Sequence, residues 1–287
     1  MQILQAITLG IIQGLTEFIP ISSSAHLVIV PWMFNWNDPA LESLTFDVSL
    51  HLGTLLALLA YFWSDWVRLV KAGVGSIVER KIGDDIDRKL AWFLVIGTIP
   101  GGIVGLLFEH TIEKLFHPSE GPIPVSSMVW MGIIVAALGA LLYLAERFAK
   151  RARKMDGVSL RDAVLIGCSQ AFAIFPGVSR SGSTITAGLA LGLERETAAR
   201  FSFLLSGPII AGAGLKSLWE IYKGIHSGVI TTAEIALFPI GFVAAAVSGY
   251  FCIRFLLRFL QKHPTNVFVY YRWLLAIFVI VLALVRA

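Results

Sequence analysis

The chain has 287 residues, of which 56% are hydrophobic and only 15% are charged. Soluble domains carry about 25% charged residues, so this composition, with a mean hydropathy of +0.77, predicts an integral membrane protein and excludes a soluble one. The formal charge of +4 does not indicate nucleic-acid binding, because basic residues of membrane proteins gather in cytoplasmic loops.

The first apolar stretch, residues 3–34, is broken in its middle. Glu17 and Pro20 interrupt it, and a run of three serines begins at Ser22. Each half is too short to cross a bilayer, which requires about 20 apolar residues. Non-helical backbone at membrane depth is tolerated only where it is buried in protein or lines a wet cavity. The pattern therefore predicts a re-entrant hairpin that enters and leaves on the same side.

Six uninterrupted apolar stretches follow the first one, and a second broken stretch at 160–193 divides them into two sets of three. The uninterrupted stretches are 46–70, 89–108, 125–146, 199–221, 231–253 and 267–285. A hairpin followed by three crossings, if repeated, turns the second half upside down relative to the first. The sequence thus predicts one all-α membrane domain over 1–287. Its plan is an inverted-topology repeat of six full transmembrane helices and two re-entrant helical hairpins, with halves at about 1–150 and 155–287.

The two broken stretches also carry related motifs. The matched pairs are Gly10 with Gly167 and Gln13 with Gln170 at a spacing of 157, and Pro20 with Pro176 and Ser23 with Ser179 at a spacing of 156. A slip of one residue reconciles the two spacings. Polar residues inside apolar surroundings are costly, so the duplication predicts one polar site where the two repeats meet.

The basic residues provide an independent test of this topology. Seventeen of the 23 lysines and arginines fall on one predicted side: Arg68, Lys71, Arg80, Lys81, Arg88, Lys89, Arg147, Lys150, Arg151, Arg153, Lys154, Arg161, Arg195, Arg200, Arg254, Arg258 and Lys262. The positive-inside rule makes that side cytoplasmic. The N-terminus and the first hairpin are then expected to enter from the outer side.

The first broken stretch carries the parts of a catalytic site. Gln13 and Glu17 are four residues apart and share a helix face. A lone intramembrane carboxylate must be protonated, paired with a cation or bound to a metal. Ser22, Ser23 and His26 follow it, and a serine and histidine beside a carboxylate indicate an activated nucleophile. The alternatives are a structural carboxylate that caps loop amides, serines that cap a helix, and a histidine with ordinary hydrogen bonds.

The second broken stretch carries donors and no carboxylate. Gly177 permits a tight loop, and Arg180 presents a planar fork suited to phosphate oxygens. The neighbouring hydroxyl groups belong to Ser179, Ser181, Ser183 and Thr184. This set predicts an anionic ligand, with phosphate the best match; the alternative is a salt bridge between Arg180 and Glu17. Arg272 is an accessory candidate, either a ligand contact or an interfacial anchor.

The run from Gln13 to His26 resembles the first signature of the bacterial undecaprenyl-diphosphate phosphatases, the bacitracin-resistance family. The run from Pro176 to Thr184 resembles the second signature, and the similarity in length and hydropathy covers essentially the whole chain. The resemblance implies hydrolysis of undecaprenyl diphosphate to undecaprenyl phosphate and inorganic phosphate in the bacterial inner membrane. That reaction recycles the lipid carrier for peptidoglycan synthesis and confers bacitracin resistance.

The family is described as assisted by Mg²⁺ or Ca²⁺, for which Glu17 is the candidate ligand here. The family's signature helix carries Glu or Gln four residues before that acid; this chain has Gln13 there, so the face offers one carboxylate. We expect Ser23 or His26 to deliver the nucleophile or activate water, and Glu17 to orient His26 or hold the metal. Arg180 is expected to be catalytic, because it grips the diphosphate and stabilises the transition-state charge. The expected substrate ligands are Ser22, Gly177, Ser179, Ser181 and Thr184.

The expected partners are a polyprenyl diphosphate and membrane lipids, with no nucleic acid, and a homodimer is considered. Two functions from other classes compete with a phosphatase. Inverted repeats with broken helices are also transporter architecture, which keeps a lipid-carrier flippase or an ion-coupled transporter open. An intramembrane protease is less well supported, because it needs an oxyanion hole but no cluster of hydroxyl groups around an arginine.

Overall fold

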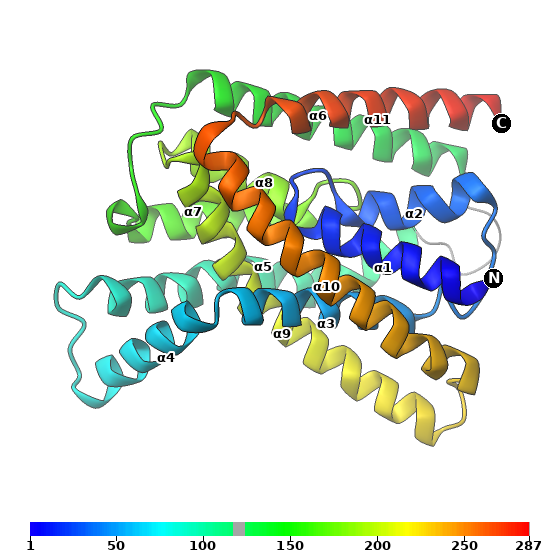
Figure 1. Ribbon diagram of the computed structural model, residues 1–287, viewed down its shortest axis with the longest axis horizontal. Helices are drawn as coiled ribbons and strands as arrows, with labels where there is room; N and C mark the ends of the chain where they lie inside the picture. Colours follow the sequence, from blue (N-terminus) through cyan, green and yellow to red (C-terminus); the bar gives the residue numbers. More distant parts are fainter. Residues whose placement is uncertain (117–123, 287) are drawn as a thin grey trace.

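The computed structural model describes residues 1–116 and 124–286 (Figure 1). The regular elements of this part of the chain are all helical. The α-helices are α1 (Gln2–Phe18), α2 (Ser23–Phe34), α3 (Leu44–Tyr61), α4 (Trp63–Val78), α5 (Ile86–Phe116), α6 (Val125–Phe148), α7 (Leu160–Ala171), α8 (Arg180–Ala190), α9 (Arg195–His226), α10 (Thr232–Lys262) and α11 (Asn266–Val285), with short 3₁₀ turns η1 (Met155–Gly157) and η2 (Phe172–Ile174). This agrees with the all-α class predicted from the sequence.

Within the described residues, six helices are long and apolar enough to cross a membrane, namely α3, α5, α6, α9, α10 and α11. They match the six predicted spans in number and order. Their ends extend past the predicted limits in most cases, because helical hydrogen bonding continues after the hydropathy falls. In α9, for example, the helix runs from Arg195 to His226.

The first predicted span, 46–70, is wrong at its end. Helix α3 stops at Tyr61 and α4 begins at Trp63, with Phe62 between them outside helical geometry (φ −98°, ψ 23°). Helix α4 carries Asp65, which accepts hydrogen bonds from Arg68 and from Arg200 of α9. Such a charged segment is unsuited to hydrocarbon, which explains why the crossing ends before it.

The two broken stretches form two short helical hairpins, α1/α2 and α7/α8. In Figure 1 the open end of the α1/α2 hairpin lies at the end of the molecule that carries both chain termini, and the α7/α8 hairpin opens at the opposite end. The connections after α4, α6, α8 and α10 also lie at that opposite end, and those after α4 and α6 hold the basic residues Arg80, Lys81, Lys150, Arg151, Arg153 and Lys154.

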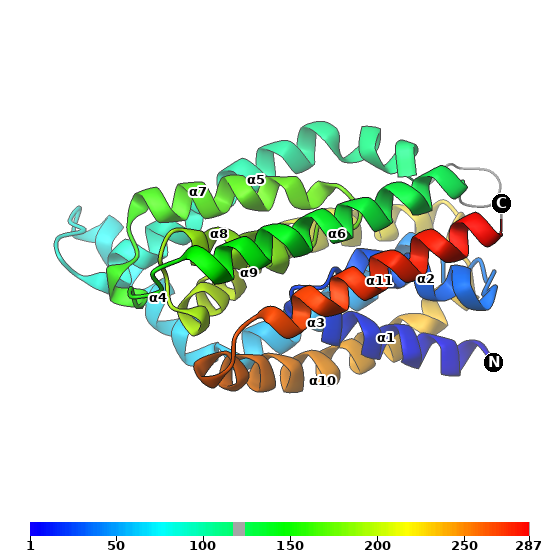
Figure 2. The same ribbon diagram turned by 90° about the horizontal axis from the view of Figure 1, so that it is seen from above.

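Each hairpin packs on a long helix from the other half of the sequence: α1 lies along α10, and α7 lies along α5 (Figure 2). Glycines permit both close approaches. A Cβ at Gly10 would lie 2.9 Å from the carbonyl oxygen of Gly241, and a Cβ at Gly167 would lie 2.1 Å from that of Gly97. Small residues at helix crossings let backbones approach closely in membrane proteins. The packing therefore interlocks the two halves and brings the closed ends of both hairpins into the interior.

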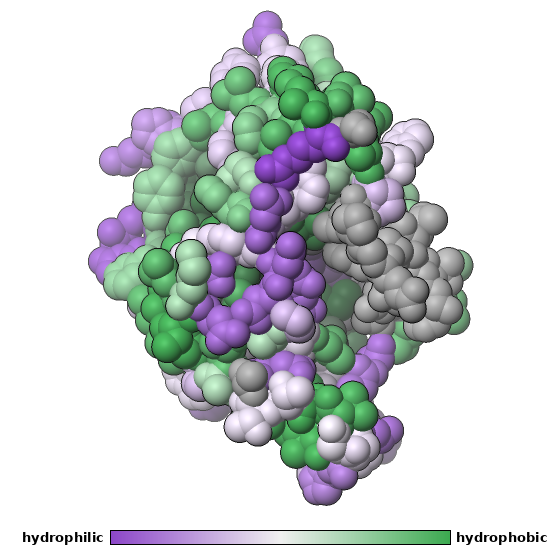
Figure 3. Space-filling view, turned by 90° about the vertical axis from the view of Figure 1, so that its right-hand side faces the viewer, coloured by the Kyte–Doolittle hydropathy of each residue, from purple (hydrophilic) through white to green (hydrophobic). Residues whose placement is uncertain are grey.

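Side-chain burial is consistent with a bundle surrounded by lipid. Many large apolar side chains on α5, α10 and α11 are exposed, for example Leu106, Phe251 and Leu274. Figure 3, which faces the end of the molecule that carries both termini, shows polar side chains in the middle of that face and apolar ones toward its edges. The exposed apolar flanks fit the hydrocarbon of a bilayer.

Candidate active site where two loops meet

The loops that close the two hairpins end in the same backbone geometry. Ser22 caps α2 with φ +79° and Ser179 caps α8 with φ +67°. Their hydroxyl oxygens accept hydrogen bonds from the amides of Ala25 (3.3 Å) and Gly182 (3.0 Å). Positive φ is uncommon outside glycine, and here it occurs at both caps. We call residues 19–22 the first loop and residues 175–179 the second loop.

The caps correct the alignment of the two motifs. Ser22 and Ser179 are 157 residues apart, the same spacing as Gly10 to Gly167 and Gln13 to Gln170. One register without a slip therefore fits all three pairs, and the predicted matches of Ser23 with Ser179 and of Pro20 with Pro176 are wrong, since Pro20 falls on Gly177 in this register. In this register Ser23 is equivalent to Arg180, and each is the first residue of its helix.

Each loop contacts the first turn of the helix that follows the other loop. The amide of Gly177 donates to the hydroxyl oxygen of Ser24 at 3.4 Å, and the hydroxyl of Ser181 donates to the carbonyl oxygen of Ile19 at 3.2 Å. Ser24 and Ser181 occupy equivalent positions in the register of 157. We call this contact region the junction.

Glu17 is the centre of the junction and is 7% exposed. Its Oε1 accepts from Arg180 Nη2 at 2.7 Å, and its Oε2 accepts from Ser23 Oγ at 2.6 Å and from Gln13 Nε2 at 3.2 Å. The chain thus brings together a carboxylate, a hydroxyl group and a guanidinium group from positions up to 163 residues apart. The salt bridge considered as an alternative from the sequence is present, and the Ser23 hydroxyl is hydrogen-bonded to the same carboxylate.

His26 has other partners. Its Nδ1 lies 2.6 Å from the carbonyl oxygen of Ser22, and its Nε2 lies 2.6 Å from the hydroxyl of Tyr271. Because a carbonyl only accepts, Nδ1 carries a proton, and neutral His26 accepts the Tyr271 proton through Nε2. Tyr271, in α11, therefore orients His26, whereas the sequence prediction left Glu17 either to orient His26 or to hold the metal. No local sequence signal indicates this contact, which joins residues 245 positions apart.

The hydroxyl groups predicted to bind substrate hold the local structure. Ser179 caps α8 and Ser181 joins the loops, as described above. Thr184 is fully buried, and its hydroxyl donates to the carbonyl oxygen of Arg180 and pairs with Ser202 of α9 at 2.6 Å. Gly177 adopts φ +94°, a conformation that favours glycine, as the predicted tight loop requires.

Arg272 lies inside the protein and is not an interfacial anchor. It is 1% exposed, and its donors bind backbone carbonyls of α6 and of both loops, including those of Pro20 and Gly177. The buried or nearly buried charged side chains that the structure describes at the junction are thus one carboxylate, Glu17, and two guanidinium groups, Arg180 and Arg272.

The sequence model of the family described as bacitracin resistance protein BacA matches residues 6–278. The chain belongs to this family. A protein of Caldicellulosiruptor bescii is 46% identical over 283 residues, which cover 99% of this chain and 98% of that protein. Proteins of Pelotomaculum thermopropionicum (46% over 286 residues; 100% of this chain and 98% of that one) and Thermomicrobium roseum (44% over 272 residues; 95% of each) are similarly close. All three are named undecaprenyl-diphosphatase.

Family members are expected to use a divalent cation, so we tested the fit of the residues present. No cluster of three or more His, Cys, Asp and Glu side chains occurs in the described residues. Both oxygens of Glu17 accept hydrogen bonds, but Gln13 Oε1 is buried and has no hydrogen-bond partner in the described part of the chain. Mg²⁺ is often held by one or two carboxylates together with substrate phosphates. Glu17 and Gln13 therefore fit a cation that is shared with a phosphorylated ligand.

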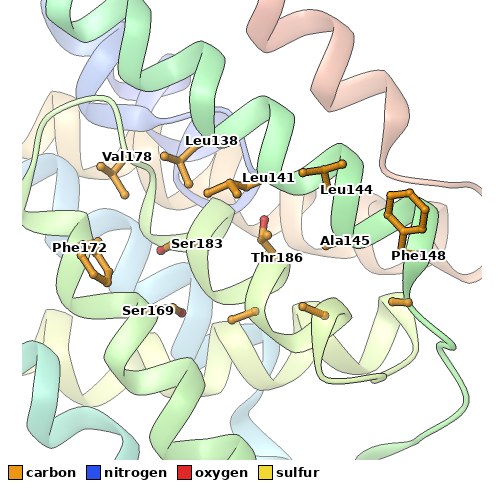
Figure 4. Close-up of a pocket in the computed structure, with 13 residues that line it drawn as sticks. Leu138, Leu141, Leu144, Ala145, Phe148, Ser169, Phe172, Val178, Ser183 and Thr186 are labelled. Atoms are coloured by element: carbon orange, nitrogen blue, oxygen red, sulfur yellow. The ribbon is translucent and has the colours of Figure 1, made fainter.

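An apolar cavity of about 670 Å³ adjoins the junction between α6, α7 and α8 (Figure 4). It is lined by leucines of α6, by Phe172 and by alanines of α8, together with Val178 and Ser183. The Ser183 hydroxyl donates to the carbonyl oxygen of Arg180 at 3.1 Å, which places the cavity beside the residue that pairs with Glu17. The shape and lining suit an apolar chain attached to a polar group at the junction.

Proposed function

We propose that this chain hydrolyses undecaprenyl diphosphate to undecaprenyl phosphate and inorganic phosphate, and so recycles the lipid carrier and confers bacitracin resistance. The observation that carries the proposal is the Glu17 carboxylate, which binds the Ser23 hydroxyl and the Arg180 guanidinium at the same time. Membership of the family and the names of its relatives support the same reaction.

The charge balance at the junction favours a phosphorylated ligand. The second guanidinium, that of Arg272, has no carboxylate partner among the described residues. Helices α2 and α8 both begin at the junction. The cap serines accept from the amides of Ala25 and Gly182, and the other first-turn N–H groups have no acceptor within the helix. An anionic diphosphate supplies both the missing negative charge and the missing acceptors.

Ser23 is the nucleophile in our proposal. Its proton already lies on a hydrogen bond to Glu17, so a base stands within reach of the attacking group. Ser23 Oγ bonds to the terminal phosphorus, the bond to the bridging oxygen breaks, undecaprenyl phosphate leaves and Glu17 takes the proton. The oxygen of a water molecule then bonds to phosphorus as the bond to Ser23 Oγ breaks. Glu17 returns its proton to Ser23 Oγ, and the protons of the water leave with the inorganic phosphate.

Arg180 stabilises the charge that develops on the transferred phosphoryl group. Its Nη2 donates to Glu17, and its Nη1 donates to the carbonyl oxygen of Ser206 at 3.4 Å. Its remaining N–H groups are therefore available to phosphate oxygens. Mg²⁺ or Ca²⁺, bound by Glu17 and Gln13, would supply further neutralisation of the diphosphate charge.

The apolar cavity between α6, α7 and α8 receives part of the prenyl chain. Its lining includes Val178 of the second loop and Ser183, whose hydroxyl donates to the carbonyl oxygen of Arg180, so a headgroup bound at the junction would lie near the cavity. Burial of apolar surface then contributes to binding without any polar contact.

The fold is an inverted repeat in which both hairpins are re-entrant. The equivalent caps, the common register of 157 and the opposite directions of the two hairpins support this arrangement. The basic end faces the cytoplasm, so the α1/α2 hairpin enters from the outer side. Labelling by an impermeant maleimide in intact cells tests this: Asn35→Cys should react from outside, and Lys81→Cys only after lysis.

Phosphate release from a prenyl diphosphate by the purified protein in detergent tests the activity. We expect Glu17→Gln, Ser23→Ala and Arg180→Ala to lose turnover, while Ser49→Ala, which removes a buried hydroxyl in α3, stays active. Acid-quenched wild type should carry phosphate on Ser23. A fully active Ser23→Ala variant would exclude serine as the nucleophile and leave His26 in that role.

Transport is the second candidate, because two hairpins that enter from opposite ends around a polar site also suit alternating access. A folded but inactive wild type in detergent, combined with lipid translocation in sealed vesicles, would favour it. The homodimer considered from the sequence stays a prediction, and sedimentation of the solubilised protein tests it.

A further inference from the structure

Arg272 is buried without a charged partner. Its side chain extends from α11 and makes four hydrogen bonds, each to a backbone carbonyl. Nε donates to Val135 (3.0 Å), Nη1 donates to Pro20 (3.0 Å), and Nη2 donates to Gly177 (3.2 Å) and Val178 (3.4 Å). A buried guanidinium without a carboxylate is costly, and the described residues place none beside it. A structural reason must offset that cost.

Two of the carbonyls that Arg272 binds, those of Pro20 and Gly177, occupy equivalent positions in the two loops. Pro20 and Gly177 are 157 residues apart, the spacing that relates the two serine caps. The two ends of one guanidinium therefore bind the same position in both loops, while Nε anchors the group to α6. The other hydrogen bonds that join the hairpins here, from Gly177 to Ser24 of α2 and from Ser181 of α8 to Ile19, measure 3.4 and 3.2 Å, and each depends on one serine hydroxyl.

The separation of the loops sets the geometry of the reaction. Glu17 and Ser23 flank the first loop and Arg180 follows the second, so any change in loop separation changes the distance between the base, the nucleophile and the guanidinium. A misplacement of about 1 Å at a reacting centre costs about 10²-fold in rate. A planar fork holds two acceptors at a fixed distance, whereas an ammonium group is a single point with rotating donors.

We propose that Arg272 is a positioning residue, which holds the two loops at the separation that phosphoryl transfer requires. This inference rests on the proposed phosphatase function. Arg272 does not touch the substrate in this role, since its nitrogens face backbone carbonyls. It acts through Glu17, Ser23 and Arg180.

Arg272→Lys and Arg272→Gln test the proposal against Trp273→Phe. Trp273 is the matched control, because it follows Arg272 on α11 and its Nε1 donates to the carbonyl of Ala136 in α6 but to neither loop. We expect both Arg272 variants to lower kcat by about 10²-fold with little change in KM, since Arg180 remains to bind phosphate. Trp273→Phe should keep the wild-type kcat. Recovery of kcat in Arg272→Lys would assign the residue a charge role and overturn the proposal.

A second measurement is independent of turnover. Spin labels on Ile19→Cys and Phe175→Cys, in a Cys168→Ala/Cys252→Ala background, report the distance between the loops. Arg272→Gln should broaden or shift that distribution and Trp273→Phe should not; an unchanged distribution in Arg272→Gln overturns the proposal. An inactive wild type would refute the phosphatase function while this arm still tests the loops. Failure of both Arg272 variants to give monodisperse protein would assign the residue to folding alone and also overturn the proposal.

Discussion

The loop between α1 and α2 and the loop between α7 and α8 both end in a serine cap with positive φ. In each, the serine hydroxyl accepts a hydrogen bond from the amide three residues further along the chain. Their chemistry differs. The first hairpin supplies Glu17, Ser23 and His26, and the second supplies Arg180. The two caps have the same backbone geometry. The carboxylate, the serine hydroxyl and the imidazole belong to the first hairpin, whereas the guanidinium group belongs to the second.

This division explains why the site requires both halves. Ser23 and Arg180 occupy equivalent positions, and both bind the single carboxylate of Glu17, at 2.6 and 2.7 Å. A symmetric site with two carboxylates or two guanidinium groups would repel itself. The same position carries a hydroxyl group in the first hairpin and a guanidinium group in the second, and the two groups meet at Glu17.

The largest expected effect comes from the group that distinguishes the second hairpin. Arg180→Lys keeps the charge but loses the fork that binds Glu17 and phosphate together, so we expect turnover to fall by about 10²–10³-fold. Phosphate release in detergent measures it. Arg254→Lys, at an exposed position on α10, is the control and should be fully active. Near-normal turnover in Arg180→Lys would remove Arg180 from the proposed mechanism.

The shared caps predict a shared response to mutation. Alanine at Ser22 or Ser179 loses the cap and strains a positive φ, so each should lower the unfolding free energy by about 2 kcal/mol. Glycine loses the cap but adopts this conformation readily, so it should cost less than alanine at both positions. Thermal unfolding of the solubilised protein measures the order. A different order in the two halves would contradict the equivalence of the loops.

The sequence predicted the six crossings and the two broken stretches, because apolar length and Pro/Ser interruptions are local signals. It also predicted that Glu17 and Arg180 approach each other, since isolated charges in an apolar chain require partners. It missed Tyr271 as the partner of His26 and Ser202 as the partner of Thr184. Both errors have the same cause: a contact between distant helices decides where a side chain points, and no local pattern encodes it.

The glutamines at the equivalent positions 13 and 170 sharpen the comparison. Gln13 donates to Glu17, whereas Gln170 is 2% exposed and its amide atoms have no hydrogen-bond partner in the described residues. Gln13→Met should lower turnover by about tenfold, since a hydrogen bond to a charged group is lost. Gln170→Met should leave turnover unchanged and the unfolding temperature equal or higher, because an unpaired buried amide is removed. Equal loss of turnover in both variants would show that Gln170 also serves the site.

The smallest expected effect concerns the apolar cavity, which lies beside the second hairpin. Ala187 lines it, and Ala187→Phe fills part of the space that the prenyl chain would occupy. We expect KM to rise a few-fold for a long-chain prenyl diphosphate, because each displaced methylene group forfeits about 0.8 kcal/mol of burial. Farnesyl diphosphate, whose chain is short, is the internal control and should keep its KM, with kcat unchanged for both. An equal rise in KM for both substrates would contradict the proposal and place the prenyl chain outside this cavity. A blocked cavity discriminates between substrates by chain length, whereas a disturbed headgroup site does not.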